Sequence, residues 1–261
     1  MLCQETILKM SNRFESVNPV AKLAAALLIA FCLVPTIDWV SSGVALLFEL
    51  IVIPFLGLGW RRFWIRTLAV WIAAPLTAVT IALYGQTSGQ VYFEWLIIRV
   101  SDGSIELAIA TALRILAIGL PSVALFVTID PTDLADGLAQ TWRLPSRFVL
   151  GALAGQRLVG LFIADWRFLN LARRSRGVAD SGRIRRIPGL VFAMLVLAIR
   201  RGSKLATAME ARGFGGTTNR TWARASQFGF TEWLVVLSGL AIGLTGDLVA
   251  IATGQWNFIL G

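Results

Sequence analysis

Two stretches of the chain share one pattern, LARRSRGV at residues 171–178 and TAMEARGF at residues 207–214. In each, an alanine stands four residues before an arginine, and a glycine and then a hydrophobic residue follow the arginine. Residues four apart lie on one face of a helix, and glycine commonly ends one. A single arginine near a helix C-terminus is also explained by the helix dipole. Two copies in one basic segment favour a pair of helix ends that dock on partners.

The segment that holds both phrases is strongly basic. Residues 140–224 contain 16 of the 24 lysines and arginines but only three acids, Asp165, Asp180 and Glu210. Positive charge beside membrane helices marks the cytoplasmic side, and it would also suit anionic lipid headgroups or an acidic protein groove. Long aliphatic stripes interrupt the basic residues and no nucleic-acid-binding motif is present, so nucleic acid is not expected as a partner.

Helical periodicity predicts two long amphipathic helices in this segment. The first covers Ser146 to Arg176 and is expected to be too polar to span a bilayer. Residues 178–188 are expected to form a basic linker that ends at Pro188, and the second helix then runs to Gly213. Six residues on the helix faces are expected to pack the two helices together or to contact a partner: Ala172, Met194, Leu197, Leu205, Ala208 and Met209.

The chain as a whole is apolar. With 56% hydrophobic residues, 15% charged residues and a mean hydropathy of +0.72, the 261 residues are too apolar for a soluble domain and predict a polytopic membrane protein. The first nineteen residues are polar and lack an uninterrupted apolar core, so no removable signal peptide is expected. The lipid bilayer is therefore a predicted partner.

Five transmembrane helices are predicted, at residues 18–37, 40–58, 67–84, 105–129 and 230–253. Asn18 is expected to cap the first helix, and Asp130 with Pro131 to start a short helix after the fourth. Residues 91–96 could form a hairpin or lie at the membrane interface.

The basic segments place the N-terminus and residues 130–228 in the cytoplasm and the C-terminus outside. The fold class is thus an all-α membrane protein with a cytoplasmic platform of long amphipathic helices, divided at 1–129, 130–228 and 229–261.

Three ionisable residues fall inside the predicted spans, Glu49, Arg114 and Asp247. An intramembrane charge costs free energy and often marks a transport pathway or a partner contact. The alternative is structural: a protonated or paired Glu49, and an Arg114 that pairs with Glu106 or extends to the membrane surface. For Glu49 the structural explanation is favoured.

The composition excludes several kinds of chemistry. The chain has no histidine, which excludes HExxH metalloproteases, Ser-His-Asp hydrolases and imidazole metal sites. Cys3 and Cys32 do not suggest a disulfide or metal framework. No GxxxxGK[ST] phosphate loop is present, so the isolated chain is not expected to hydrolyse ATP. No cofactor, no metal and no catalytic residue are expected.

Several phrases in order resemble the transmembrane (T) component of energy-coupling factor (ECF) transporters of the cobalt and biotin permease type. These ABC importers take up vitamins and transition-metal ions in prokaryotes. The phrases are Asn18-Pro-x-x-Lys22-Leu23, Thr128-x-Asp130-Pro131-x-x-Leu134, Leu144-Pro145 and the two Arg-Gly phrases. Each phrase alone is weakly specific, but together they are specific and cover almost the whole chain.

The resemblance implies partners and a role for both Arg-Gly phrases. Family members assemble with two ABC ATPase subunits, identical or different, and with a small substrate-binding membrane protein, the S component. Two coupling helices end in three-residue motifs whose central arginines insert into grooves on the ATPases. The implied function is a non-catalytic coupling subunit in the prokaryotic cell membrane, which links ATP hydrolysis to reorientation of the S component for vitamin or metal-ion uptake. The matching positions are Ser175, Arg176, Gly177, Ala211, Arg212 and Gly213, with Ser175 where the family commonly has alanine.

Two other functions stay open. A secondary carrier or channel would use Glu49, Arg114 and Asp247 to line a pathway and would transport without ATPases. A membrane-anchored scaffold would bind acidic proteins or lipids through the basic segment. The scaffold would tolerate rearranged charges within residues 173–201, whereas docking on ATPases requires Arg176 and Arg212 specifically.

Overall fold

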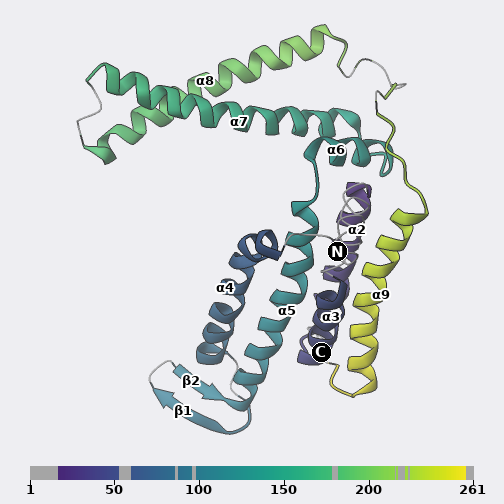
Figure 1. The fold of residues 1–261 in the computed structure, drawn as a ribbon. Helices are drawn as coiled ribbons and strands as arrows, with labels where there is room; N and C mark the ends of the chain where they lie inside the picture. Colours follow the sequence, from purple (N-terminus) through teal and green to yellow (C-terminus); the bar gives the residue numbers. More distant parts are fainter. Residues whose placement is uncertain are drawn as a thin grey trace, which may run out of the picture. The chain divides into compact units, whose positions relative to one another are not determined.

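The computed structural model describes residues 17–52, 60–85, 88–95, 98–177, 182–214, 216, 221–222 and 224–256. These residues form eight helices and one two-stranded hairpin (Figure 1), which confirms the all-α fold class. Contacts divide the chain into two compact units. Unit 1 comprises residues 1–134 and 227–261, and unit 2 comprises residues 135–226. The three-part division drawn from the sequence stays a prediction.

Unit 1 contains the helices that correspond to the five predicted spans: α2 (Pro19–Leu33), α3 (Trp39–Val52), α4 (Trp60–Tyr84), α5 (Asp102–Val127) and α9 (Phe230–Ala252). Asn18 caps α2 as predicted, because its side-chain oxygen accepts a hydrogen bond from the Val20 N–H at 3.0 Å and Pro19 takes the first helical position. The predicted end of the second span, residues 53–58, lies outside the described residues.

Four helical segments in the described chain are long and apolar enough to cross a membrane: Phe63–Tyr84, Asp102–Phe126, Ser146–Ser175 and Phe230–Ala252. Several apolar helices of this length indicate a multi-pass membrane protein. Helix α2 is apolar but has 15 residues, fewer than the roughly 20 that a straight crossing needs, and the described part of α3 has 14. The expectation that residues 146–176 are too polar to span is wrong, because Ser146–Ser175 is long and apolar enough to cross a membrane. Only Arg157 and Asp165 are charged between residues 148 and 165; Arg147 stands at the start of the helix, and Arg167, Arg173 and Arg174 lie toward its end.

Close packing in unit 1 depends on small residues of α9. A Cβ added at Gly239 would lie 2.8 Å from the Ala25 Cα in α2, and one at Gly243 would lie 2.7 Å from the Cys32 Cβ. These contacts bring the backbones of α2 and α9 together, as small residues commonly do between membrane helices. In Figure 1 the two helices lie side by side, and α4 pairs with α5.

A hairpin connects α4 to α5. Its strands, β1 (Val91–Trp95) and β2 (Ile98–Ser101), pair antiparallel with Val91 opposite Ser101. The hairpin alternative for residues 91–96 is therefore confirmed. Ser101 then caps α5 through a capping box with Ser104, in which each side chain bonds the backbone of the other residue.

Unit 2 contains most of α6 (Pro131–Gln140) and all of α7 (Ser146–Ser175) and α8 (Arg183–Ala211). Asp130 starts α6 as predicted, since its carboxylate accepts a hydrogen bond from the Thr132 N–H at 2.7 Å. Helix α8 begins earlier than expected: Pro188 lies inside it and does not end a linker.

Residues 224–226, which follow α8 and precede α9, are hydrogen-bonded to α6 within unit 2. The Gln140 side chain donates to the Arg224 carbonyl at 2.8 Å and accepts from the Ser226 N–H at 2.9 Å. A small apolar cluster of Ala135, Ala139 and Val149 joins α6 to the start of α7.

Candidate functional site

Helices α7 and α8 cross each other and run in opposite directions (Figure 1). A two-pronged ion pair joins them, because Arg201 Nη1 lies 2.6 Å from Asp165 Oδ2 and Nη2 lies 3.2 Å from Oδ1. Nearer the end of α7, Arg173 Nη2 donates to the Gly189 carbonyl at 2.8 Å. Between Arg201 and Asp165, the Nη2–Oδ1 contact is a hydrogen bond, and the Nη1–Oδ2 contact is a close approach of opposite charges. The crossing is therefore fixed by directional polar contacts at two places.

The predicted apolar stripe of α8 separates into two kinds of residue. Met194, Leu197, Leu205 and Met209 are half-buried, whereas Ala208, like Ala172 of α7, is exposed. The opposite side of α8 also carries large apolar side chains, and they are exposed: Val191, Phe192, Leu195, Val196 and Ile199. Phe192 is 68% exposed. A helix that is apolar on its outer face offers that face to a partner or to the bilayer.

The two Arg-Gly phrases form helix ends of the same geometry. Arg176 closes α7 with φ −90° and ψ 4°, and Arg212 closes α8 with φ −89° and ψ 11°. The glycine that follows each arginine has positive φ, 68° at Gly177 and 76° at Gly213. The backbone therefore turns the same way after both arginines.

Hydrogen bonds identify this turn as a glycine-terminated helix end. At α8, the Gly213 N–H donates to the Glu210 carbonyl and the Phe214 N–H to the Met209 carbonyl, both at 2.9 Å, which is the Schellman arrangement. At α7, the Gly177 N–H donates to the Arg174 carbonyl at 3.0 Å, and Val178 lies outside the described residues. The similarity of the two phrases in sequence thus extends to their backbone structure.

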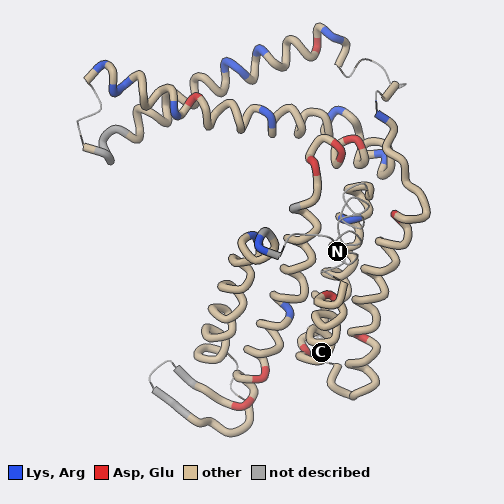
Figure 2. Tube along the Cα trace, viewed as in Figure 1, with Lys and Arg blue, Asp and Glu red and all other residues tan. Residues whose placement is uncertain are grey.

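Both arginines present their side chains to solvent. Arg176 and Arg212 are exposed, and in the described part of the chain neither guanidinium makes an ion pair or a side-chain hydrogen bond. Ser175, next to the first, turns its hydroxyl back to donate to the Ala172 carbonyl at 2.9 Å. Figure 2 shows other basic residues along both helices. A free guanidinium at a rigid helix end can bind a carboxylate or backbone carbonyls through its fixed fork of donors.

Glu49, one of the three ionisable residues of the predicted spans, lines a small cavity in the described part of the chain. Glu49 is only 2% exposed and lines a cavity of about 50 Å³ with apolar residues of α2, α5 and α9, while Arg114 and Asp247 do not line it. Among the described residues, neither Glu49 carboxylate oxygen has a hydrogen-bond partner, and Arg114 does not pair with Glu106.

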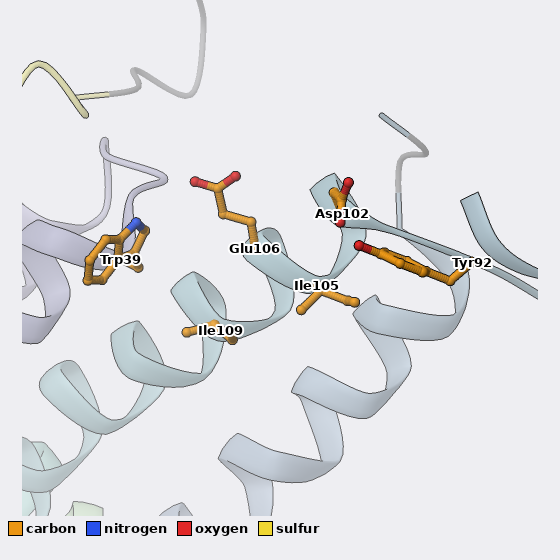
Figure 3. Close-up of a pocket in the computed structure, with 6 residues that line it drawn as sticks. All are labelled: Trp39, Tyr92, Asp102, Ile105, Glu106 and Ile109. Atoms are coloured by element: carbon orange, nitrogen blue, oxygen red, sulfur yellow. The ribbon is translucent and has the colours of Figure 1, made fainter. Parts of the chain in front are cut away.

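A larger pocket of about 450 Å³ lies beside the hairpin, lined by Trp39, Tyr92, Asp102, Ile105, Glu106 and Ile109 (Figure 3). A hydrogen bond to the Asp102 carboxylate raises the pKa of the Tyr92 hydroxyl. No cluster of three or more potential metal-binding side chains occurs among the residues that the structure describes. The pocket includes neither Arg-Gly helix end.

Sequence reasoning missed the polar contacts between distant residues. One is the Asp165–Arg201 ion pair, for which opposite charges on the two amphipathic helices were a signal. Another joins Lys22 Nζ to Thr128 Oγ1 at 3.2 Å. Both residues belong to phrases that carried the resemblance, but nothing in the sequence indicated that the two phrases meet.

Comparison with known proteins places the chain in a family. Residues 10–222 match the cobalt transport protein family, CbiQ. Three relatives are named energy-coupling factor transporter transmembrane protein EcfT. Those of Exiguobacterium sibiricum and Listeria monocytogenes are each 25% identical to this chain. The first alignment covers 84% of this chain and 89% of the relative, and the second covers 83% and 85%. The protein of Lactobacillus helveticus is 26% identical over 78% of each chain. The chain therefore belongs to the CbiQ family of cobalt transport proteins, and its resemblance to the transmembrane component of energy-coupling factor transporters is confirmed.

Proposed function

We propose that this chain is the transmembrane coupling subunit of an ECF-type ABC importer. Two cytoplasmic ABC ATPases bind it, and their ATP hydrolysis drives reorientation of a small substrate-binding membrane protein. The chain itself is not an enzyme, and the cargo is a vitamin or a metal ion. It lies in a prokaryotic cell membrane with its N-terminus and residues 130–228 in the cytoplasm.

The observation that carries this proposal is the pair of matched helix ends. Arg176 and Arg212 have the same backbone conformation, both are exposed, and each is followed by a glycine with positive φ. Two equivalent anchors suit two equivalent grooves, as a pair of ATPases offers. The name of the relatives, energy-coupling factor transporter transmembrane protein, supports the same assignment.

The ion pair between α7 and α8 supports a mechanical role for the crossed helices. Arg201 and Asp165 hold the crossing, so a displacement of one Arg-Gly end is passed to the other helix. The exposed apolar side of α8, which includes Phe192 and Ile199, is suited to contact with the substrate-binding membrane protein. The ATPases would then bind the helix ends, and the substrate-binding protein would bind the helix face.

Charge reversal at the helix ends tests the proposal. A buried arginine anchor at an interface typically contributes ~2 kcal/mol or more, about a thirtyfold change in affinity. We expect Arg176→Glu and Arg212→Glu each to reduce, and the double variant to abolish, co-purification of the two ATPases from native membranes. The chain should still insert into the membrane.

Arg200→Glu is the matched control, because Arg200 is an exposed arginine on the same helix as Arg212 but not at its end. We expect it to retain the ATPases. Normal ATPase recovery and normal uptake with the double variant would refute docking at these ends. Uptake by the chain without any ATPase would favour the carrier or channel.

A further inference from the structure

A group of polar residues lies in unit 1 where the chain leaves for unit 2 and where it returns. We call Asn18, Lys22, Thr128, Gln227 and Glu232 the polar junction. They come from the start of α2, the end of α5, the segment that leads into α9 and the first turn of α9. Unit 1 ends at Leu134 before α6 enters unit 2, and it resumes at Gln227. The junction therefore includes residues from both connections to the segment with the Arg-Gly helix ends.

Lys22 binds α2 to the outgoing connection. Its side chain is completely buried, and Nζ donates to Thr128 Oγ1 at 3.2 Å. Thr128 is the C-cap of α5, and its hydroxyl donates to the Leu125 carbonyl at 2.8 Å. Burial of a lysine costs free energy unless the ammonium group is hydrogen-bonded. An apolar side chain would fill the same space at the start of this apolar helix without that cost.

Asn18 binds the same helix to the returning connection. Its side-chain nitrogen donates to the Gln227 carbonyl at 3.0 Å, and its backbone N–H lies 3.5 Å from Glu232 Oε1. The other Glu232 oxygen accepts from the Gly229 N–H at 2.8 Å, which holds the first turn of α9 in place. One turn of α2, from Asn18 to Lys22, is thus hydrogen-bonded to both connections.

We propose that the polar junction transmits movement of residues 135–226 to the membrane helices, with Asn18 and Lys22 as positioning residues for transport. The inference rests on the proposed function. Only two stretches of chain join the crossed helices to unit 1, and a flexible stretch transmits no force unless it is fixed near its attachment. Hydrogen bonds are directional, so the junction fixes both stretches on one rigid helix that also packs tightly against α9 through Ala25 and Gly239.

The test compares ATP hydrolysis with uptake in the complete complex reconstituted in lipid vesicles. Lys22→Met keeps the length of the side chain and removes its donor, and Asn18→Ala removes the bond to Gln227. Because Asn18 also caps α2, Asn18→Ser is measured beside Asn18→Ala: serine keeps an oxygen for the cap and lacks the amide donor to Gln227. We expect the assembled complexes to hydrolyse ATP within twofold of the wild-type rate and to lose at least tenfold in substrate taken up per ATP. A residue that only stabilises the fold would not change this ratio.

Two further variants keep the result interpretable. The pair Lys22→Met with Thr128→Val replaces both partners by apolar groups, which usually preserves folding, so it should fold and still be uncoupled. Ser41→Ala is the matched control, since it removes a buried side-chain bond to Asp38 of 2.7 Å outside the junction. It should leave the ratio unchanged.

Unchanged uptake per ATP in the junction variants would overturn the proposal, as would an equal loss in Ser41→Ala. Failure of the proposed function gives a different result, because the wild-type complex would then show no ATP-dependent uptake at all. The two failures are therefore distinguished by the wild-type measurement.

Discussion

At the scale of single residues, the glycines after Arg176 and Arg212 are required by backbone conformation and not by space. Gly177 and Gly213 both have positive φ, and a Cβ added at either would meet no atom within 4 Å. For any other residue this conformation costs about 1–2 kcal/mol. The glycines thus fix where each helix ends and, with it, the position of the arginine before it.

Replacement of one such glycine should weaken both the helix end and the docking. We expect Gly213→Ala to lower the free energy of unfolding by about 1 kcal/mol and to reduce ATPase recovery, because the turn after Arg212 relaxes. Gly202→Ala is the control, since Gly202 lies inside α8 with open space around its Cα and without positive φ. Alanine there should stabilise the helix by up to about 1 kcal/mol. Thermal unfolding in detergent measures both, and a shift in the same direction for the two variants would contradict this explanation.

Residues whose role is local were predictable, and residues whose partner is distant were not. The cap by Asn18 follows from its place before Pro19, because the bond to Val20 spans two residues. The bond from the same side chain to Gln227 joins residues 209 apart and has no sequence pattern. Likewise, the sequence puts Asp165 and Arg201 on two separate predicted helices, and only the crossing of α7 and α8 brings them together.

At the scale of elements, α9 packs closely because its glycines leave room for neighbouring backbones. Gly243 faces Cys32, whose Cβ and sulfur would lie 2.7 and 2.9 Å from an added Cβ. We expect Gly243→Leu to force α9 away from α2 and to destabilise the protein by about 1–3 kcal/mol. Gly155→Leu in α7 is the control, because no atom lies within 4 Å of a Cβ there. Denaturation in detergent measures both, and equal stability of the two variants would show that the close packing is not needed.

Most helix bounds were predictable to within a few residues, since apolar runs and caps are properties of neighbouring residues. The predicted start of α4 was wrong, because the helix begins at Trp60 and not at residue 67. The end of the linker at Pro188 was predicted wrongly. Proline removes one backbone hydrogen bond and can kink a helix without ending it, and α8 continues through Pro188. Helix α7 shows a different limit: composition alone fits a membrane span as well as an amphipathic helix.

At the scale of the whole molecule, the place of α7 decides whether the helix ends can reach cytoplasmic partners. If α7 crossed the bilayer, Arg176 would lie on the outer side. Helix α8 argues against a crossing, because it is not apolar enough to span, and its Arg201 pairs with Asp165 well inside α7. A bilayer that surrounded α7 at Asp165 would also surround Arg200 and Lys204, because they lie beside Arg201 in α8. Each charge at the bilayer centre costs roughly 2.5–3.5 kcal/mol.

Cysteine labelling decides between these arrangements. In a chain with Cys3 and Cys32 replaced by alanine, we expect Tyr92→Cys in the exposed hairpin to react with a membrane-impermeant maleimide in intact cells. We expect Ser203→Cys, on an exposed position of α8, to react only after the membrane is permeabilised, because basic segments stay in the cytoplasm. Labelling of both cysteines in permeabilised cells is the control for reactivity. Labelling of Ser203→Cys in intact cells would place Arg212 outside with it, where no ATPase can bind, and docking through the Arg-Gly ends would then be impossible.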